Sequence, residues 1–228
     1  MNQRTVLNQI FNFAILEGDL EYNPCSAIQT PKNLKKTKRQ AANKEDEIKV
    51  IESKDIWSFP YIALMTGMRK GEILALQWKD IDFDKNIIHV TKSAVYKGNR
   101  PFIKEPKTEA GCRIVPLLDD LKEFLIKQPN RKPDYFVVSE TGEEPLASRR
   151  FQTLSKHYKE QTGITCTAHP LRHSFATNAY EKEVDVKGIQ EIVGHKHLST
   201  TLNIYTHFRE QSVKKAAEKL NSKTESDK

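Results

Sequence analysis

The sequence predicts a mainly α-helical protein of the α+β class, with a small three-stranded antiparallel sheet inserted among the helices. Two observations support this fold class. Apolar residues recur at helical spacing through most of the chain, and between residues 86 and 115 the pattern changes to short β-prone runs separated by turns. With 228 residues, of which 37% are hydrophobic and 29% charged, the chain is long enough for one large domain and a fragment of another.

The first predicted helix covers residues 8–24, where apolar side chains fall on one helical face and Gly18 and Asn23-Pro24 end the pattern. A single helix cannot bury its own apolar face, so it needs a partner to pack against. We therefore expect residues 1–30 to be the last part of a helical domain whose beginning lies outside this sequence.

A basic segment at residues 31–42 follows this helix and is expected to be a linker. Its cations, with no acidic residue among them, are Lys32, Lys35, Lys36, Lys38 and Arg39. Two interpretations are open: a solvated linker, or a basic strap that binds along a phosphate backbone. The net charge of +7 and the pI near 9.2 also favour a polyanionic partner.

Residues 43–228 are predicted to form a second domain, which begins at Asn43, a residue suited to cap a helix. Helices are expected at residues 43–52, 56–66, 70–77, 117–127, 148–161, 170–181, 186–193, 199–205 and 209–220. Strands are expected at residues 87–96, 100–107 and 111–117, separated by turns at 97–99 and 108–111.

Cysteine usage and hydropathy predict a cytoplasmic protein with no membrane partner. Cys25, Cys112 and Cys166 are far apart in the sequence and form no CxxC motif, as in a protein with reduced thiols. No apolar run approaches the roughly 20 residues that span a bilayer, and the first residues lack the apolar core of a signal peptide.

The stretch AHPLRHSFATN, residues 168–178, places His169, Arg172 and His173 on one turn of a predicted helix. A metal site is disfavoured, because a guanidinium would lie beside the cation and no carboxylate stands between the histidines. The same residues suit an anion: a helix N-terminus near Pro170 attracts negative charge, and Arg172 offers a planar set of donors. A merely basic surface helix is the other interpretation open at this motif.

Two further motifs accompany this one. In MTGMRKGEILALQWKDID, Arg69 follows a glycine turn and Glu72 comes three residues later, which alone indicates no more than a helix start with an ion pair. In GHKHLSTTLNIYTH, His195 is followed ten residues later by Tyr205, on a short helix that Ser199 is suited to cap.

In their order and combination, these motifs resemble those of the tyrosine recombinases, or phage integrase family, from about residue 43 to residue 210. The resemblance implies the tyrosine recombinase catalytic-domain fold. It also implies a catalytic set consisting of Tyr205, Arg69, Lys107, His169, Arg172 and His195. Supporting positions by the same resemblance are Glu72, His173 and His207.

By this resemblance, Tyr205 attacks a DNA phosphate and forms a 3′-phosphotyrosine, while Arg69 and Arg172 bind the phosphate oxygens. His169 assists as a proton acceptor, and Lys107, in the turn after the second strand, protonates the leaving 5′ oxygen. Lys104 is a rival for the role of the lysine. No metal or other cofactor is implied, because the covalent intermediate conserves the bond energy for rejoining.

The resemblance implies a site-specific DNA recombinase or integrase of a phage or integrative mobile element. Its expected partner is double-stranded DNA. The protein is expected to be a monomer when free in solution and a homotetramer when bound to paired DNA sites. The helix at 209–220 resembles the family tail that docks on a neighbouring subunit, and a solvated terminal helix is the other interpretation. Alternative functions are a type IB topoisomerase-like enzyme and a DNA-binding module without catalysis.

Overall fold

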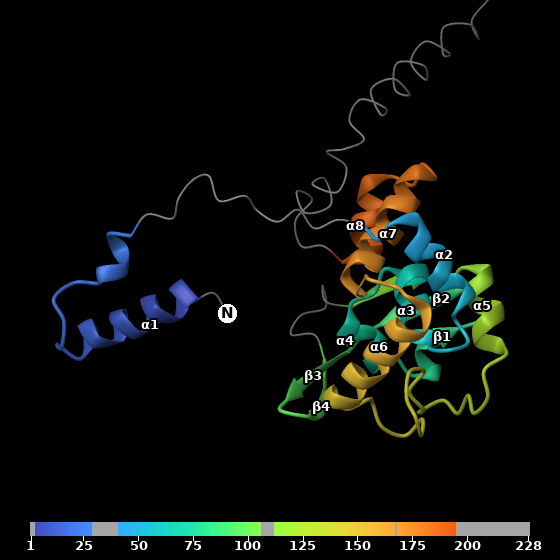
Figure 1. Cartoon of the computed structure of the whole chain (residues 1–228), viewed down its shortest axis with the longest axis horizontal. Coiled ribbons are helices and arrows are strands. Elements are labelled where there is room, and N and C mark those ends of the chain that lie inside the picture. Colours follow the sequence, from blue (N-terminus) through green and yellow to red (C-terminus); the bar gives the residue numbers. More distant parts are fainter. Residues whose placement is uncertain (1–2, 29–40, 106–111, 167, 195–228) are drawn as a thin grey trace, which may run out of the picture. The chain divides into compact units, whose positions relative to one another are not determined.

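The computed structural model describes residues 3–28, 41–105, 112–166 and 168–194 (Figure 1). The chain divides into two compact units, Met1–Lys38 and Arg39–Lys228, which are described separately. The expected helices at 199–205 and 209–220 and the predicted turn at 108–111 lie outside the described residues. The last two residues of the predicted strand at 100–107 and the first residue of the predicted strand at 111–117 also lie outside them.

The first unit contains the helix α1 (Gln3–Leu16) and the short 3₁₀ helix η1 (Pro24–Ser26). The predicted helix at 8–24 is therefore wrong in its bounds: α1 starts earlier and ends before Gly18, whose φ of +82° is left-handed. Asn23 caps η1 by accepting a hydrogen bond from the backbone N–H of Cys25 at 2.9 Å. Within this unit, the exposed apolar side chains of α1 are Val6, Leu7, Ile10, Phe13 and Leu16.

The second unit is mainly helical. Its helices are α2 (Lys44–Glu52), α3 (Ser58–Thr66), α4 (Lys70–Ala75), α5 (Asp119–Ile126), α6 (Ser148–Thr162), α7 (Ala168–Glu181) and α8 (Val186–Val193), with the 3₁₀ helix η2 (Trp78–Asp80). The predicted cap at Asn43 is confirmed, since its side chain accepts from the N–H of Asp46 at 2.6 Å. Helix α7 begins two residues before the predicted start, so His169 belongs to its first turn.

The strands form two small antiparallel sheets. One has the order β1 (Ile81–Asp82), β2 (Ile87–Val90) and β5 (Arg113–Pro116), and the other is the hairpin β3 (Ser93–Lys97) and β4 (Arg100–Lys104). The three-stranded antiparallel sheet is thus confirmed, but its membership differs from the prediction. The predicted strand at 87–96 is split between the two sheets, and β1 was not predicted.

The split occurs beside Lys92, whose side chain is mostly buried. Its ammonium group donates to Gln77 Oε1 at 2.6 Å and lies 3.0 Å from Asp80 Oδ2. These contacts draw the chain toward η2, so that β3 leaves the first sheet and pairs with β4 instead. In Figure 1 the β3–β4 hairpin lies at the opposite end of the second unit from α7 and α8.

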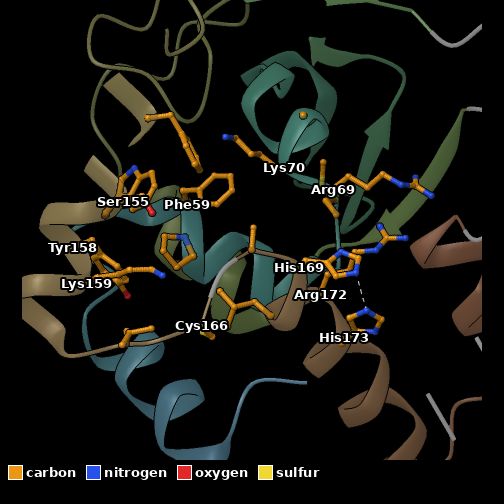
Figure 2. Close-up of a pocket in the computed structure, with 18 of the residues that line it drawn as sticks. Phe59, Arg69, Lys70, Ser155, Tyr158, Lys159, Cys166, His169, Arg172 and His173 are labelled. Atoms are coloured by element: carbon orange, nitrogen blue, oxygen red, sulfur yellow. Dashed lines mark hydrogen bonds between the residues drawn. The ribbon is translucent and has the colours of Figure 1, made fainter. Parts of the chain in front are cut away.

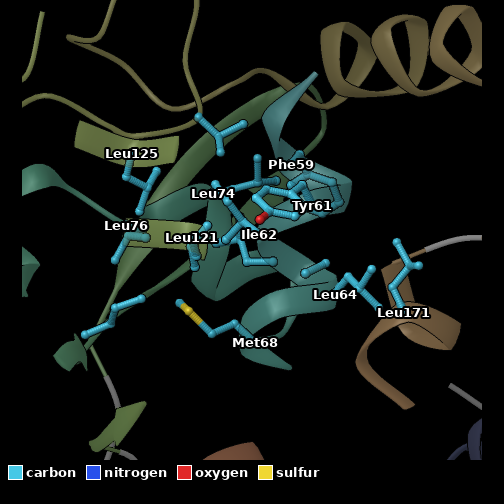
Figure 3. Packing of buried hydrophobic residues seen from close by; sticks show 14 of the residues in the cluster. Phe59, Tyr61, Ile62, Leu64, Met68, Leu74, Leu76, Leu121, Leu125 and Leu171 are labelled. Carbon is cyan, nitrogen blue, oxygen red and sulfur yellow. The ribbon is translucent and has the colours of Figure 1, made fainter. Parts of the chain in front are cut away.

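Helix α3 is the centre of the core. All of its residues except Ser58 and Met65 are buried, and Figure 3 shows Tyr61 and Ile62 among leucines from α4 and α5. The helix ends at Gly67, which has a left-handed φ of +63° and lies so close to α7 that a Cβ atom would be 2.5 Å from the Phe175 ring. This close approach brings the start of α4 to the first turns of α7. Among the helices of the described ranges, none has both the length and the apolarity required to cross a membrane.

Candidate active site

Arg69 caps the start of α4, directly after the turn at Gly67. Its backbone N–H donates to Glu72 Oε2 at 2.7 Å, and its Nη1 donates to Glu72 Oε1 at 2.8 Å. The glutamate at the third helical position thus reaches back to the cap, as in a capping box. The Arg69 side chain remains 48% exposed, so its guanidinium is accessible from solvent.

Arg172 extends from α7 and is buried. Its Nη1 donates to the carbonyl oxygen of Gly67 at 2.8 Å, and its Nη2 donates to the carbonyl oxygen of Val193. Burial, followed by the positive charge of Arg69, lowers the pKa of Arg172 to about 9. The group therefore remains cationic at neutral pH, held rigidly between the ends of α3 and α8.

A third arginine, Arg113 in β5, joins these two. Its Nη1 and Nη2 donate to the two oxygens of Glu72 at 2.8 and 2.6 Å, and its Nε donates to the carbonyl oxygen of Ile192 at 2.7 Å. Bidentate pairs of this geometry are among the strong charge-assisted hydrogen bonds of proteins. Arg113 was not among the site residues predicted from the sequence. The signal that could have found it is its position two residues before the buried Val115, which places both on one face of the strand.

The C-terminal end of α8 is bound by all three arginines. Arg113, Arg172 and Arg69 donate to the carbonyl oxygens of residues 192, 193 and 194, in that order. These carbonyls are at the negative end of the helix dipole and have few partners within the helix, so cations are favoured there. The arginine cluster therefore fixes the point where the chain leaves α8, immediately before His195 in the sequence.

Glu72 supplies the negative charge at the centre of the cluster. Burial would raise the pKa of its carboxyl group, but hydrogen bonds and charge from Arg113, and then hydrogen bonds from Arg69, outweigh burial and lower the pKa to about 2. The carboxylate is therefore ionised throughout the neutral range. It balances part of the repulsion among three neighbouring guanidinium groups.

His169 and His173 lie one helical turn apart on α7 and contact each other. Their Nε2 atoms are 3.0 Å apart, and the rings are nearly perpendicular. In such a contact one Nε2 donates and the other accepts, so the two rings take complementary roles. Within the described ranges, no group of three or more His, Cys, Asp or Glu side chains is arranged to hold a metal ion.

The two histidines, Arg69 and Arg172 border a cavity of about 800 Å³ (Figure 2). Figure 2 shows Arg69, His169 and Arg172 on one side of the cavity and the aromatic rings of Phe59 and Tyr158 on the other. Lys70 points toward the aromatic side, where its ammonium nitrogen is 3.5 Å from the centroid of the Phe151 ring, and burial lowers its pKa. The cavity thus offers cations and imidazole to an anion and an apolar wall behind them.

The structure brings together five of the predicted site residues: Arg69, Glu72, His169, Arg172 and His173. The other predicted catalytic and supporting residues lie outside the described residues: Lys107, His195, Tyr205 and His207. The same is true of the linker cations Lys32, Lys35, Lys36, Lys38 and Arg39.

Comparison with solved structures shows that this helical fold is that of the tyrosine recombinase catalytic domain. The structure of the Tn1549 transposon integrase in complex with transposon right end DNA matches this chain with a TM-score of 0.70 at 24% sequence identity. The match covers 96% of this chain and 78% of the integrase chain. The predicted fold class is confirmed.

The phage integrase family model matches residues 32–212, and the chain belongs to this family. The XerC-like tyrosine recombinase of Caldanaerobacter subterraneus subsp. tengcongensis is 30% identical over 94% of the chain. The tyrosine recombinase XerA of Pyrococcus furiosus is 33% identical over the same share. The chain spans 63% of the length of the first relative and 71% of the second.

Proposed function

We propose that this protein is a site-specific DNA recombinase that cleaves and rejoins DNA through a 3′-phosphotyrosine on Tyr205. The observation that supports it best is the pairing of Arg69 and Arg172 beside His169 at one cavity, in a member of the phage integrase family. The relatives described above are named as tyrosine recombinases and as a transposon integrase. The recombinase is proposed to belong to a phage or to an integrative mobile element.

In this proposal the arginines stabilise the negative charge that develops on the non-bridging phosphate oxygens. Arg172 is rigid because two backbone carbonyls hold it, and Arg69 is accessible from solvent although Glu72 orients it. Donors that are already oriented need no reorganisation during the reaction, which is the main source of electrostatic catalysis. His195 is proposed to add a further donor.

Proton transfer is assigned to His169 and Lys107. The phenol of Tyr205 has an ordinary pKa near 10, so at neutral pH it needs a proton acceptor, for which His169 is suited. The contact with His173 supports this role because it orients the His169 ring. Lys107 is proposed to protonate the leaving 5′ oxygen, and Glu72 and His207 to support the catalytic groups.

The proposed partner is double-stranded DNA, with the protein monomeric in solution and tetrameric on paired sites. Residues 1–30 are proposed to belong to a helical DNA-binding domain, residues 31–42 to a linker that contacts phosphates, and residues 43–228 to the catalytic domain. Action in the cytoplasm stays a prediction.

The test uses nicked suicide duplexes with a randomised 30-base-pair core, so that the target sequence need not be known. A covalent protein–DNA complex should be resolved on a denaturing gel, and sequencing should identify the DNA that was cleaved. Mass spectrometry should locate the DNA adduct on Tyr205. Tyr205→Phe should abolish the complex and retain non-covalent binding, whereas the matched control Tyr180→Phe should still form it. A complex on Tyr180, or an unaffected Tyr205→Phe variant, would refute the proposal.

The same experiment separates recombination from topoisomerase-like relaxation. Adding a second duplex with a free 5′-hydroxyl should give strand exchange between two molecules. Relaxation of supercoiled plasmid without exchange would support the topoisomerase-like alternative instead.

A further inference from the structure

We propose that Arg113 is a positioning residue for strand cleavage, which acts through Glu72 on Arg69 and through the Ile192 carbonyl on the end of α8. This inference rests on the proposed recombinase function. Arg113 is not among the residues that line the cavity, whereas Arg69 and Arg172 are. Its effect on a bound phosphate must therefore be exerted through its neighbours.

The contacts of Arg113 use the whole guanidinium group. All three nitrogens donate to acceptors on two other elements, Glu72 of α4 and Ile192 of α8. The Arg113 and Glu72 side chains are only 10% and 8% exposed, so this pair is well shielded from solvent. A lysine has one compact ammonium group and cannot reproduce the planar, three-nitrogen arrangement.

Glu72 transmits this placement to Arg69. Its Oε1 accepts from both Arg113 and Arg69, so the carboxylate that orients Arg69 is itself oriented by Arg113. Without Arg113, burial would favour the protonated carboxyl group, which attracts Arg69 less. A half-exposed arginine that loses such an anchor regains rotamer freedom and is then less often aligned with the phosphate.

The second path passes through α8. The ideal Cβ position at Gly194 is 3.1 Å from Cδ and Nε of Arg113, so the end of α8 lies directly against the guanidinium group. Gly194 has a left-handed φ of +68°, and its carbonyl oxygen accepts from Arg69. Arg113 thereby helps to fix the start of the segment that carries His195 in the sequence.

The experiment measures single-turnover cleavage at saturating protein, together with equilibrium DNA binding, on a duplex selected as above. Wild-type protein is tested first: an adduct that forms supports the proposed function independently of Arg113. Arg113→Met should then slow cleavage by about 100-fold, the order expected when a catalytic group is misplaced by about 1 Å. DNA affinity should change less than about threefold, because a positioning role affects the transition state more than binding.

The route through Glu72 is tested by a double variant. Glu72→Gln combined with Arg113→Met should cleave no more than about threefold slower than the slower single variant, because both changes disrupt one unit. Rate losses that multiply would show that Arg113 acts independently of Glu72 and would overturn the inference. Arg131→Met, at an exposed arginine beside Phe83, is the matched control and should cleave normally.

Two measurements distinguish positioning from a general loss of structure. Arg113→Met should move the acid limb of the cleavage rate to higher pH, because it removes the main group that keeps Glu72 ionised. Arg113→Lys should cleave faster than Arg113→Met, and its acid limb should lie between those of Arg113→Met and the wild type. If the methionine variant fails to fold, the lysine variant is compared with the wild type instead. If either variant cleaves at the wild-type rate and its acid limb is unchanged, the inference is overturned and the proposed function remains intact.

A carbon-13 NMR titration of the Glu72 carboxyl group, assigned by its absence in Glu72→Gln, needs no catalysis. The carboxyl group should titrate at higher pH in Arg113→Lys than in the wild type. An unchanged titration would overturn the inference even if no DNA adduct forms, so its failure is distinguishable from failure of the proposed function.

Discussion

Replacing Glu72 with glutamine should reveal how strongly the arginine cluster stabilises the fold. The substitution keeps the volume of the side chain but removes its charge. In the folded protein the pKa of Glu72 is about 2, against an ordinary value of 4.5. This difference corresponds to about 3 kcal/mol of stability that the ionised carboxylate contributes.

The pH dependence of this contribution has a definite direction. Because the folded pKa is lower than the unfolded pKa, the stabilisation is fully present above pH 4.5 and is lost as the pH falls toward 2. About 2 kcal/mol should be lost by pH 3. At neutral pH the glutamine variant also leaves the largely buried Arg113 side chain without its counter-ion, and breaking a buried pair costs roughly 3–5 kcal/mol.

Urea unfolding followed by tryptophan fluorescence is a suitable assay, because Trp57 and Trp78 both belong to the second unit. The wild type should exceed Glu72→Gln in free energy of unfolding by roughly 3–5 kcal/mol at pH 7, and this difference should shrink by about 2 kcal/mol at pH 3. Glu52→Gln, at an exposed glutamate, should behave like the wild type. A difference that stays constant between pH 7 and pH 3 would refute the assignment of Glu72 as the ionised centre of the cluster.

Three further outcomes are expected. Replacing the bridging 5′ oxygen of the DNA with sulfur should rescue single-turnover cleavage by Lys107→Ala, because a thiolate leaves without a proton. It should not rescue Arg69→Ala, because the charge on the non-bridging oxygens still needs a cation. If sulfur fails to rescue Lys107→Ala, another residue is the proton donor. Cleavage should be unchanged in excess EDTA, since side-chain cations replace a metal in the proposed mechanism, and loss of activity that magnesium restores would contradict it. In urea unfolding, Gly98→Ala should lower the free energy of unfolding by roughly 1–2 kcal/mol, and Gly67→Ala should lower it by more. Both glycines have a left-handed φ, but only Gly67 faces the Phe175 ring. Equal losses of stability would exclude the contact with Phe175 as a cause.

Local sequence determined most of the helices and the motifs on them. Periodicity predicted α8 at its observed bounds, and the cap at Asn43 was predictable because its side chain bonds to a backbone group three residues later. Helical spacing likewise predicted that His169, Arg172 and His173 lie on neighbouring turns of one helix. These features depend on interactions within a few residues, which the order of amino acids specifies directly.

Tertiary structure decided how these pieces meet. The predicted strand at 87–96 is split where Lys92 binds Gln77 and Asp80, which come from an earlier segment, and periodicity alone contains no information about such partners. The family resemblance implied that Glu72 supports the catalytic arginines, but not that Arg113, 41 residues later in the chain, binds the same carboxylate. A buried charge needs a counter-charge, and only the packing of β5 against α4 and α8 determines which residue supplies it.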